Sequence, residues 1–251
     1  MENDKDIILG LDVSTTCIGC CLLWNDGSKY GKVIELTHIV PKVSKKIKTI
    51  ESLFLKDAIF TNEFLMKWKD IGIKKVVIEE PLLSSNNSIT VSTLLRFNGM
   101  ISESVYNVLN IVPEYISSYE ARKFSFPNLM GIRKYHKDGT MVAKEKILSA
   151  LKKNNLVLFG AYPWDVDKKT ILQSNVAEIF PEITWVYDNN GELRKENFDA
   201  SDAYVACYGY LNKARHGELD MKISNIELTD EYITYDLEYW GETEKRKITF
   251  R

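Results

Sequence analysis

The most constraining feature of the chain is an apolar run near its N-terminus, I-I-L-G-L-D-V, which spans residues 7–13 and carries one acid, Asp12. A run without polar alternation is typical of a strand that is covered on both faces. An ionised carboxylate at the end of such a strand is costly unless a positive group lies against it. The run therefore predicts a central strand with a functional acid at its end.

Further acids are expected at the same site as Asp12. Glu79 follows the apolar run V-V-I, and the pair Asp199 and Asp202 opens an apolar helical pattern. Their three-residue spacing puts both aspartates on one face of a first helical turn, where the helix dipole tolerates negative charge. Taken alone, Asp199 also fits an ordinary N-cap and Asp202 an ordinary first-turn acid. Acids at the ends of separate core elements, without a matching His or Cys cluster, indicate hard divalent cations held by oxygen ligands.

Size and composition predict one main domain with an appendage. The chain has 251 residues, 45% of them hydrophobic, which is enough to bury a full core. No apolar stretch approaches the roughly 20 residues that cross a bilayer. The polar start M-E-N-D-K-D is unlike a signal peptide, so we expect a cytoplasmic protein with no membrane partner. The Lys, Asn and Ile usage is typical of an AT-rich genome, and it suggests a bacterial or phage-infected cell.

The four cysteines are interpreted as buried thiols. Cys17 and Cys20 have C-x-x-C spacing, but no second cysteine or histidine pair completes a zinc site. Cys21 follows directly in a strand-like stretch, and Cys207 lies far along the chain. Core thiols of this kind are typical of a reducing compartment.

The order of apolar patterns predicts an α/β fold. Strands at residues 7–13, 18–24 and 32–40 are expected to form an antiparallel meander, and a crossover helix at 47–68 leads to a parallel strand at 75–80. The remaining expected elements are helices at 89–109, 118–124, 141–153, 167–179 and 199–214, a strand at 111–117, and a three-stranded β appendage over 221–250. The small residues Ala200, Ala203 and Ala206 would let the last helix lie close against the sheet.

Basic residues gather between residues 119 and 153, with nine Lys or Arg against three acids in a chain of net charge -2. The predicted DNA contacts among them are Arg122, Lys123, Arg133, Lys134, Lys137 and Lys146. Tyr135 and His136 lie in the same expected loop, which suits a phosphate track with stacking groups. The alternative is an ordinary solvated face of a helix and a loop.

As a set, the motifs resemble the RuvC-like Holliday-junction resolvases of the ribonuclease H superfamily. The resemblance rests on I-I-L-G-L-D-V-S-T-T, V-V-I-E-E-P, L-L-R-F-N-G-M, Y-E-A-R-K and F-D-A-S-D-A-Y-V-A, which occur in the family's order. It implies a ribonuclease H-like mixed five-stranded sheet, an antiparallel meander plus parallel strands, flanked by helices. The expected domains are a nuclease domain at 1–217, with an insertion at about 154–197, and a C-terminal β appendage at 218–251.

For function, the resemblance implies a homodimeric endonuclease of DNA recombination and repair that cuts two strands of a four-way junction. The implied catalytic and metal-binding acids are Asp12, Glu79, Asp199 and Asp202, with Glu80 as the rival of Glu79. Lys144 is the implied basic catalytic residue, and Lys146 is the second choice. The expected cofactor is a pair of Mg²⁺ ions about 4 Å apart, bridged by Asp12, with Mn²⁺ as a substitute. The helix at 89–109 is either the dimer interface or simply a core helix.

Three rival interpretations remain open. A different ribonuclease H-like nuclease would cut flaps or RNA/DNA hybrids, and a non-catalytic relative would only bind DNA. A small actin-like or sugar-kinase-like ATPase would use G-L-D-V-S-T-T as a phosphate loop, but the 13 glycines include no G-G or G-x-G cluster. The C-terminal appendage has eight acids against five bases from Leu219, which argues against broad DNA contact there.

Overall fold

The computed structural model describes residues 6–81, 87–159, 167–217 and 221–250. The chain divides into two compact units, which are described separately. The first unit comprises Met1–Ala121 and Leu172–Leu211, and the second comprises Arg122–Ile171 and Asn212–Arg251. The expected division into a nuclease domain at 1–217 and an appendage at 218–251 stays a prediction.

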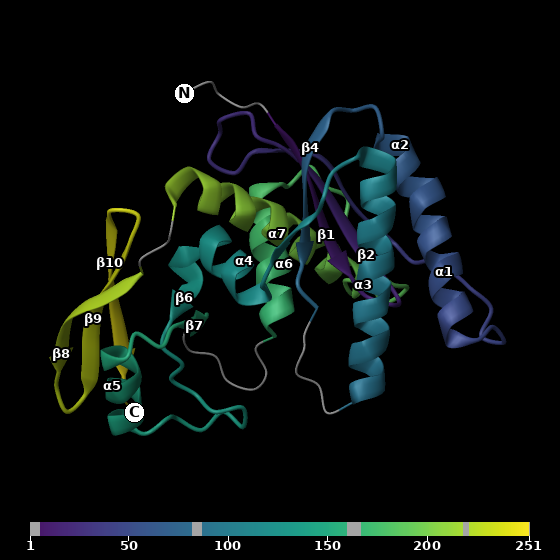
Figure 1. The fold of residues 1–251 in the computed structure, drawn as a ribbon. Helices are drawn as coiled ribbons and strands as arrows, with labels where there is room; N and C mark the ends of the chain where they lie inside the picture. The colour runs from purple at the N-terminus through teal and green to yellow at the C-terminus, as the bar shows by residue number, and fades with distance from the viewer. Residues whose placement is uncertain (1–5, 82–86, 160–166, 218–220, 251) are drawn as a thin grey trace. The chain divides into compact units, whose positions relative to one another are not determined.

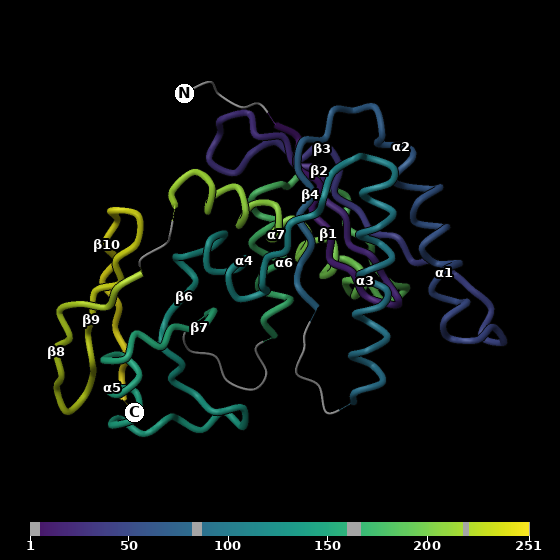
Figure 2. The backbone as a smooth tube through the Cα atoms, in the orientation of Figure 1, coloured from purple at the N-terminus to yellow at the C-terminus, as the bar shows by residue number. Residues whose placement is uncertain are grey.

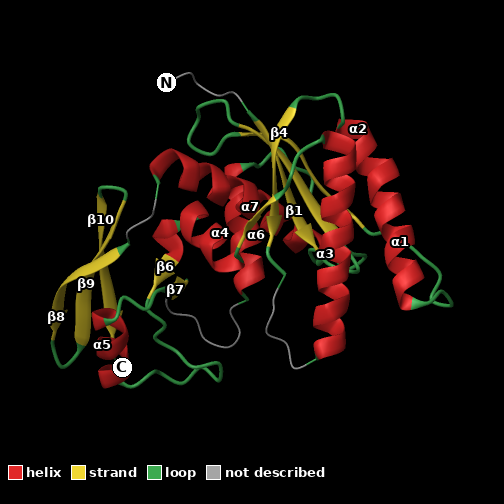
Figure 3. Ribbon diagram, in the orientation of Figure 1, coloured by secondary structure: helices red, strands yellow, loops and turns green. Residues whose placement is uncertain are grey.

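The first unit is built on a mixed five-stranded sheet, whose central strands β1 and β4 are labelled in Figure 3. The strand order is β3-β2-β1-β4-β5. Its strands are β1 (Ile7–Val13), β2 (Ile18–Trp24), β3 (Lys32–Ile39), β4 (Ile73–Glu79) and β5 (Glu114–Ile116). Strands β1, β2 and β3 are antiparallel neighbours, whereas β4 pairs in parallel with both β1 and β5. The predicted mixed sheet, an antiparallel meander extended by parallel strands and flanked by helices, is confirmed.

One face of this sheet is covered by the helices that follow β3 and β4. They are α1 (Thr49–Phe60), the π-helical turn η1 (Thr61–Leu65), α2 (Met66–Trp68) and α3 (Ser88–Leu109). Helices α1 and α3 lie side by side there (Figure 1). Leu9, Leu11 and Val13 of β1 belong to the buried cluster on this face. Because successive strand residues point to opposite faces, Gly10 and Asp12 are turned to the other side.

The other face carries α7 (Glu196–His216), which returns to the first strand from the far end of the chain (Figure 2). A Cβ atom at Gly10 would lie 2.3 Å from the carbonyl oxygen of Ala203 and 2.6 Å from the sulfur of Cys207. The Cys207 thiol donates to the carbonyl of Ile8 at 3.6 Å. Glycine on the strand and small residues on the helix therefore permit this close approach, as predicted.

The second unit contains a three-stranded antiparallel sheet with the order β10-β9-β8, which confirms the predicted β appendage. Its strands are β8 (Lys222–Leu228), β9 (Tyr232–Tyr239) and β10 (Glu242–Thr249). The unit also holds η2 (Pro127–Leu129), α5 (Lys144–Lys152) and the short pair β6 (Met130–Gly131) and β7 (Val157–Leu158). Ile233, Tyr235, Leu237 and Ile248 supply the buried side of the sheet.

Three expected boundaries were wrong by three residues each. Strand β5 begins at Glu114 and not at 111, since Pro113 has no N–H to give to a ladder. Helix α5 begins at Lys144 and not at 141, because Met141 is held extended in a bridge to Tyr135. Helix α7 begins at Glu196 and not at 199.

Within the ranges described above, no helix is long and apolar enough to cross a membrane.

The helices α4 (Ser118–Ser125) and α6 (Lys168–Ile179) confirm the two remaining helix predictions. Gly209 of α7 passes close to α4, since a Cβ there would lie 2.5 Å from the carbonyl oxygen of Ala121. Phe180, directly after α6, packs edge-on against Tyr204 of α7 with ring centroids 5.1 Å apart. These contacts fix the direction of α7 over the sheet and so the position of its first turn.

Candidate acidic site at the end of the central strands

Asp12 and Glu79 lie side by side on neighbouring parallel strands. Strands β1 and β4 pair so that Leu11 lies opposite Ile78, and the next residue on each strand is the predicted acid. Leu11 and Ile78 both point into the core under α1 and α3. Alternation therefore turns both carboxylates to the face that carries α7. Both acids are half-buried.

The first turn of α7 lies directly beside Asp12. Gly19 of β2 is the cross-strand partner of Asp12, so both residues face the same side of the sheet. A Cβ at Gly19 would lie 1.9 Å from the carbonyl oxygen of Asp199 and 2.9 Å from the backbone nitrogen of Ala200. The fold thus brings the backbone of a third predicted acid to the neighbouring strand position.

The last predicted acid is more deeply buried. Asp202 lies three residues beyond Asp199 and is only 3% exposed. Because α7 begins at Glu196, Asp199 is a first-turn residue within the helix, and its interpretation as an N-cap was wrong. The first turn therefore holds both Glu196 and Asp199, and it is more acidic than the sequence pattern predicted.

Cys17 is part of this site, although the sequence indicated only a core thiol. It is buried, as predicted. Asp199 lies close enough to its thiol to act on it as a hydrogen-bond acceptor. Burial raises the pKa of Cys17 well above its usual range, and Asp199, Asp12 and Glu196 raise it further by their negative charge. The thiol is therefore a protonated donor toward an acid at physiological pH.

His38 is a second residue that sequence reasoning missed. It is the cross-strand partner of Gly19 on β3, which puts it in one row with Gly19 and Asp12. Burial lowers the pKa of His38, Glu196 and Asp199 oppose that shift, and Arg194 adds to it. His38 is placed beside the acids by the pairing register between β2 and β3, and the sequence alone does not determine that register.

Glu80, the rival of Glu79, has a different environment. It is exposed and follows the end of β4, and its backbone N–H donates to the carbonyl of Ile116 at 2.8 Å. Glu79 remains within the ladder, opposite Ile116 of β5. The surroundings favour Glu79 as the functional acid, and this choice stays a prediction.

The chemistry of the acids fits a hard divalent cation, since carboxylate oxygens are the ligands that Mg²⁺ prefers. Among the residues that the structure describes, however, no three His, Cys, Asp or Glu side chains already lie together as a metal site. The assignment of Asp12, Glu79, Asp199 and Asp202 as metal ligands therefore stays a prediction.

Lys144 belongs to the second unit, where it is tied to the C-terminal sheet. Its ammonium donates to the carbonyl of Thr229 at 2.5 Å and lies 3.8 Å from a carboxylate oxygen of Asp230. The ammonium also lies 5.3 Å from the centre of the Phe250 ring. The structure therefore gives Lys144 a role in holding α5 to the turn between β8 and β9, and its catalytic role stays a prediction.

All six predicted DNA contacts also belong to the second unit. They are Arg122, Lys123, Arg133, Lys134, Lys137 and Lys146. The second unit carries 18 Lys and Arg against 13 Asp and Glu, whereas the first carries 15 against 22. The nearly neutral chain is thus divided into an acidic unit with the candidate site and a basic unit.

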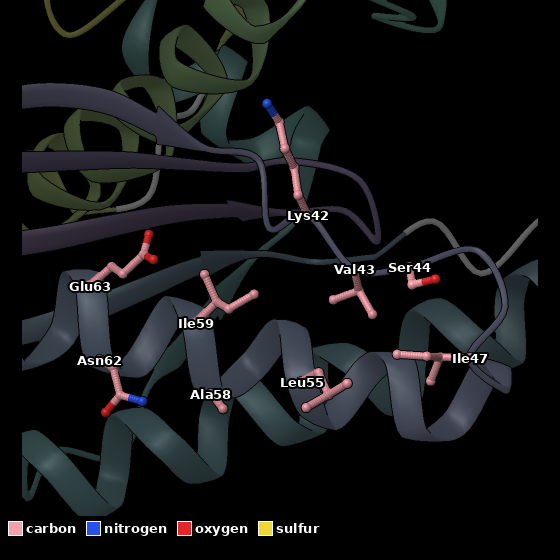
Figure 4. Close-up of a pocket in the computed structure, with 9 residues that line it drawn as sticks. All are labelled: Lys42, Val43, Ser44, Ile47, Leu55, Ala58, Ile59, Asn62 and Glu63. Carbon is pink, nitrogen blue, oxygen red and sulfur yellow. The ribbon is translucent and has the colours of Figure 1, made fainter.

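A separate hollow of about 410 Å³ lies in the first unit, between residues 42–47 and α1 (Figure 4). Its walls are mainly apolar, with Val43 and Ile47 on one side and Leu55 and Ile59 on the other. None of the predicted acids lines it. The candidate site therefore depends on the strand ends and not on this hollow.

No family model matches this chain, and no curated protein matches it in sequence. Solved structures with a similar backbone course include the following three. Thermus thermophilus RuvC in complex with a Holliday junction substrate has a TM-score of 0.49 and 13% identity, over 83% of this chain and 96% of that one. A second T. thermophilus RuvC structure has a TM-score of 0.44 and 14% identity, over 84% of this chain and 96% of that one. The yeast mitochondrial Holliday junction resolvase Ydc2 has a TM-score of 0.45 and 11% identity, over 83% of this chain and 78% of that one.

Proposed function

We propose that this chain is a structure-selective DNA endonuclease that resolves four-way junctions by metal-dependent phosphodiester hydrolysis. The observation that carries the proposal is the placement of Asp12 beside Glu79 at the ends of two central strands, facing the first turn of α7. Acids collected from separate core elements are expensive to keep unless they have a common charged ligand. The choice of a four-way junction as the substrate rests on the resemblance of the sequence motifs to RuvC-like resolvases.

In this proposal Asp12, Glu79, Asp199 and Asp202 would hold two Mg²⁺ ions, for which Mn²⁺ could substitute. Such ions, when bound, polarise the scissile phosphate and acidify a water molecule. Without a cation the neighbouring carboxylates repel one another. Cation binding would therefore draw the acids closer together and stabilise the first unit.

The residues around the acids support this role. The buried Cys17 thiol stays protonated beside Asp199, so it is a potential hydrogen-bond donor to that carboxylate. Asp202 is nearly inaccessible, and a charge in such a low-dielectric setting interacts more strongly with a cation than an exposed one does. His38 faces the same side of the sheet and is available to contact the substrate phosphate.

DNA binding is proposed for the basic second unit, and a homodimer is proposed because a two-fold assembly matches the symmetry of a four-way junction. Helix α3 suits the dimer interface on one of its sides. Ile89, Leu95 and Tyr106 are 75%, 42% and 49% exposed, whereas Phe97 and Ile101 lie in the core. The core and interface interpretations thus apply to different faces of the same helix.

The test is cleavage by the purified full-length chain in the presence of Mg²⁺. The substrates are a synthetic four-way junction, a linear duplex of the same sequence, a flap and an RNA/DNA hybrid. Symmetric cuts at the junction, with the linear duplex left intact, are the expected result. Equal or faster cutting of the flap or hybrid would indicate a different ribonuclease H-like nuclease. ATP hydrolysis without any nuclease activity would replace the proposal with the kinase-like alternative.

A further inference from the structure

Two hollows in the second unit are lined in part by residues of the edge strand β10. The first has a volume of about 290 Å³ and lies between residues 128–132 and the β10 residues Arg246 and Lys247. The second, of about 420 Å³, is lined by Tyr135, Met141 and Thr249, among others. Lys134 lines both hollows. Because they share Lys134 and are lined by the consecutive residues Ile248 and Thr249, the two hollows are treated together and named the β10 groove.

We propose that the β10 groove binds the phosphate backbone of a DNA strand, so that the C-terminal sheet is part of the DNA-binding surface. The inference rests on the proposed nuclease function and assigns part of its substrate contact. It also reverses the expectation that the acidic appendage stays away from DNA. The excess of acids in that segment is an average, whereas its edge strand lines the groove with Arg246 and Lys247.

The two lysines of the groove keep their charge available. The Lys134 ammonium lies 5.4 Å from the centre of the Tyr135 ring, and the Lys247 ammonium lies 4.1 Å from that of Tyr232. Among the described residues, neither ammonium is within salt-bridge distance of a carboxylate. An aromatic face restrains a cation without neutralising it. Lys144 and Arg246, by contrast, are each paired with an acid.

The walls of the groove are held together by hydrogen bonds, so it exists before any ligand arrives. The Arg246 guanidinium donates to the carbonyl of Asn128 and to Glu244. The hydroxyl of Tyr235, the cross-strand partner of Arg246, is hydrogen-bonded to the backbone of Ile132. The segment at 128–132 is therefore fixed against the sheet.

The dimensions suit a short piece of nucleic-acid backbone. From Arg246 to Thr249 a strand advances by about 10 Å, at roughly 3.3 Å per residue. Along a duplex, the phosphates of one strand follow one another at about 3.4 Å of axial rise. Successive phosphates of one strand are farther apart than this rise because the backbone winds around the axis, so the groove is long enough for about two of them. Tyr135 lines it for contact with sugar or base.

The experiment measures the affinity of the full-length chain for a fluorescent four-way junction over a series of salt concentrations, without Mg²⁺. The double variant Lys134→Ala/Lys247→Ala should flatten the slope of log Kd against log salt by about 2, at roughly 0.9 for each phosphate contact on duplex DNA. Lys245→Ala is the matched control, since Lys245 is exposed on the same strand but lines neither hollow. It should keep a slope close to that of the wild type.

An unchanged slope in the double variant would overturn the inference, and so would an equal loss in Lys245→Ala. Hydrogen exchange gives a second readout on the wild type, because junction DNA should slow amide exchange in residues 128–134 and 245–249. Unaltered exchange there would also overturn it. If the wild type cuts junctions and the double variant keeps the wild-type salt slope, only the groove inference is refuted and the proposed nuclease function stands. Wild-type protein that binds DNA without cutting it refutes the nuclease proposal and leaves the groove measurable.

Discussion

The carbonyl oxygen of Asp199 occupies the space that a side chain at Gly19 would need, 1.9 Å from the position of a Cβ atom. Gly19 is also the cross-strand partner of Asp12. A single glycine therefore sets the distance between the first turn of α7 and the central acid. Any larger residue at this position must push the helix away from the sheet.

Gly19→Ala is predicted to damage both stability and activity. The added methyl group meets backbone atoms, which cannot rotate away, so we expect a loss of about 1–3 kcal/mol in the free energy of unfolding. Cleavage should fall at least tenfold because Asp199 moves with the helix. The control is Gly99→Ala on the exposed side of α3, where a Cβ has nothing within 4 Å. It should stabilise the chain by up to about 1 kcal/mol, and a Gly19→Ala variant that behaves like this control would contradict the close approach.

Glu79→Gln and Glu80→Gln form a matched pair of neighbouring acids. The first change should reduce junction cleavage about a thousandfold, since loss of a metal ligand costs several kcal/mol of transition-state stabilisation. The second should leave the rate within about threefold of the wild type, because Glu80 is exposed beyond the end of β4. Single-turnover cleavage of the junction measures both rates. The reverse order of effects would make Glu80 the functional acid.

Asp57→Asn is predicted to stabilise the first unit at neutral pH. Burial raises the pKa of Asp57, the hydrogen bond from Ser104 opposes the shift, and Glu103 adds to it. One of its carboxylate oxygens is buried without a hydrogen-bond partner. Because the pKa of Asp57 is higher in the folded chain than its unfolded value of 3.8, the protonated side chain stabilises the fold at a pH below 3.8. That contribution is lost as the pH rises through the folded-state pKa.

The gain from Asp57→Asn should be on the order of 1 kcal/mol at pH 7 and should shrink as the pH falls toward 4. Thermal unfolding of both proteins at several pH values measures it, with about 2–4 °C expected for each kcal/mol. Ser104→Ala is the counterpart, since it removes the 2.9 Å hydrogen bond to Asp57 and should destabilise. A pH-independent difference between Asp57→Asn and the wild type would show that burial of the charge is not the cause.

Mg²⁺ is predicted to raise the unfolding temperature of the chain without any DNA. A ligand that binds only the folded state at a hundred times its Kd contributes about 2.7 kcal/mol. Asp12→Asn should lose most of this metal-dependent rise, while Glu80→Gln should retain it. Differential scanning calorimetry with and without Mg²⁺ gives the comparison. Equal rises in wild type and Asp12→Asn would place any bound cation away from Asp12.

The sequence was sufficient to predict the strands that carry Asp12 and Glu79, because each acid ends an unbroken apolar run and a crossover helix makes the two strands parallel. Cys17 and His38 were missed for a physical reason. Their position beside the acids depends on lateral register across β1, β2 and β3, which alternation within one strand does not determine.

The start of α7 and the β10 groove could not be predicted from the sequence either, because both depend on contacts that form only in the folded chain. Glu196 begins the helix where Arg194 pairs with it at 2.8 Å, a contact that the D-x-x-D spacing does not indicate. Lys134 and Lys247 come together only through the packing of residues 128–132 on the C-terminal sheet. Composition averaged over that segment concealed its one basic edge.

Junction cleavage by wild type and Asp12→Asn over a Mg²⁺ titration, with junction binding followed in parallel, tests the central claim most directly. The account predicts that the wild type cuts only when Mg²⁺ is present, and that Asp12→Asn binds the junction normally but does not cut it. Cleavage by Asp12→Asn at the wild-type rate, or wild-type cleavage that is indifferent to Mg²⁺, would contradict the account.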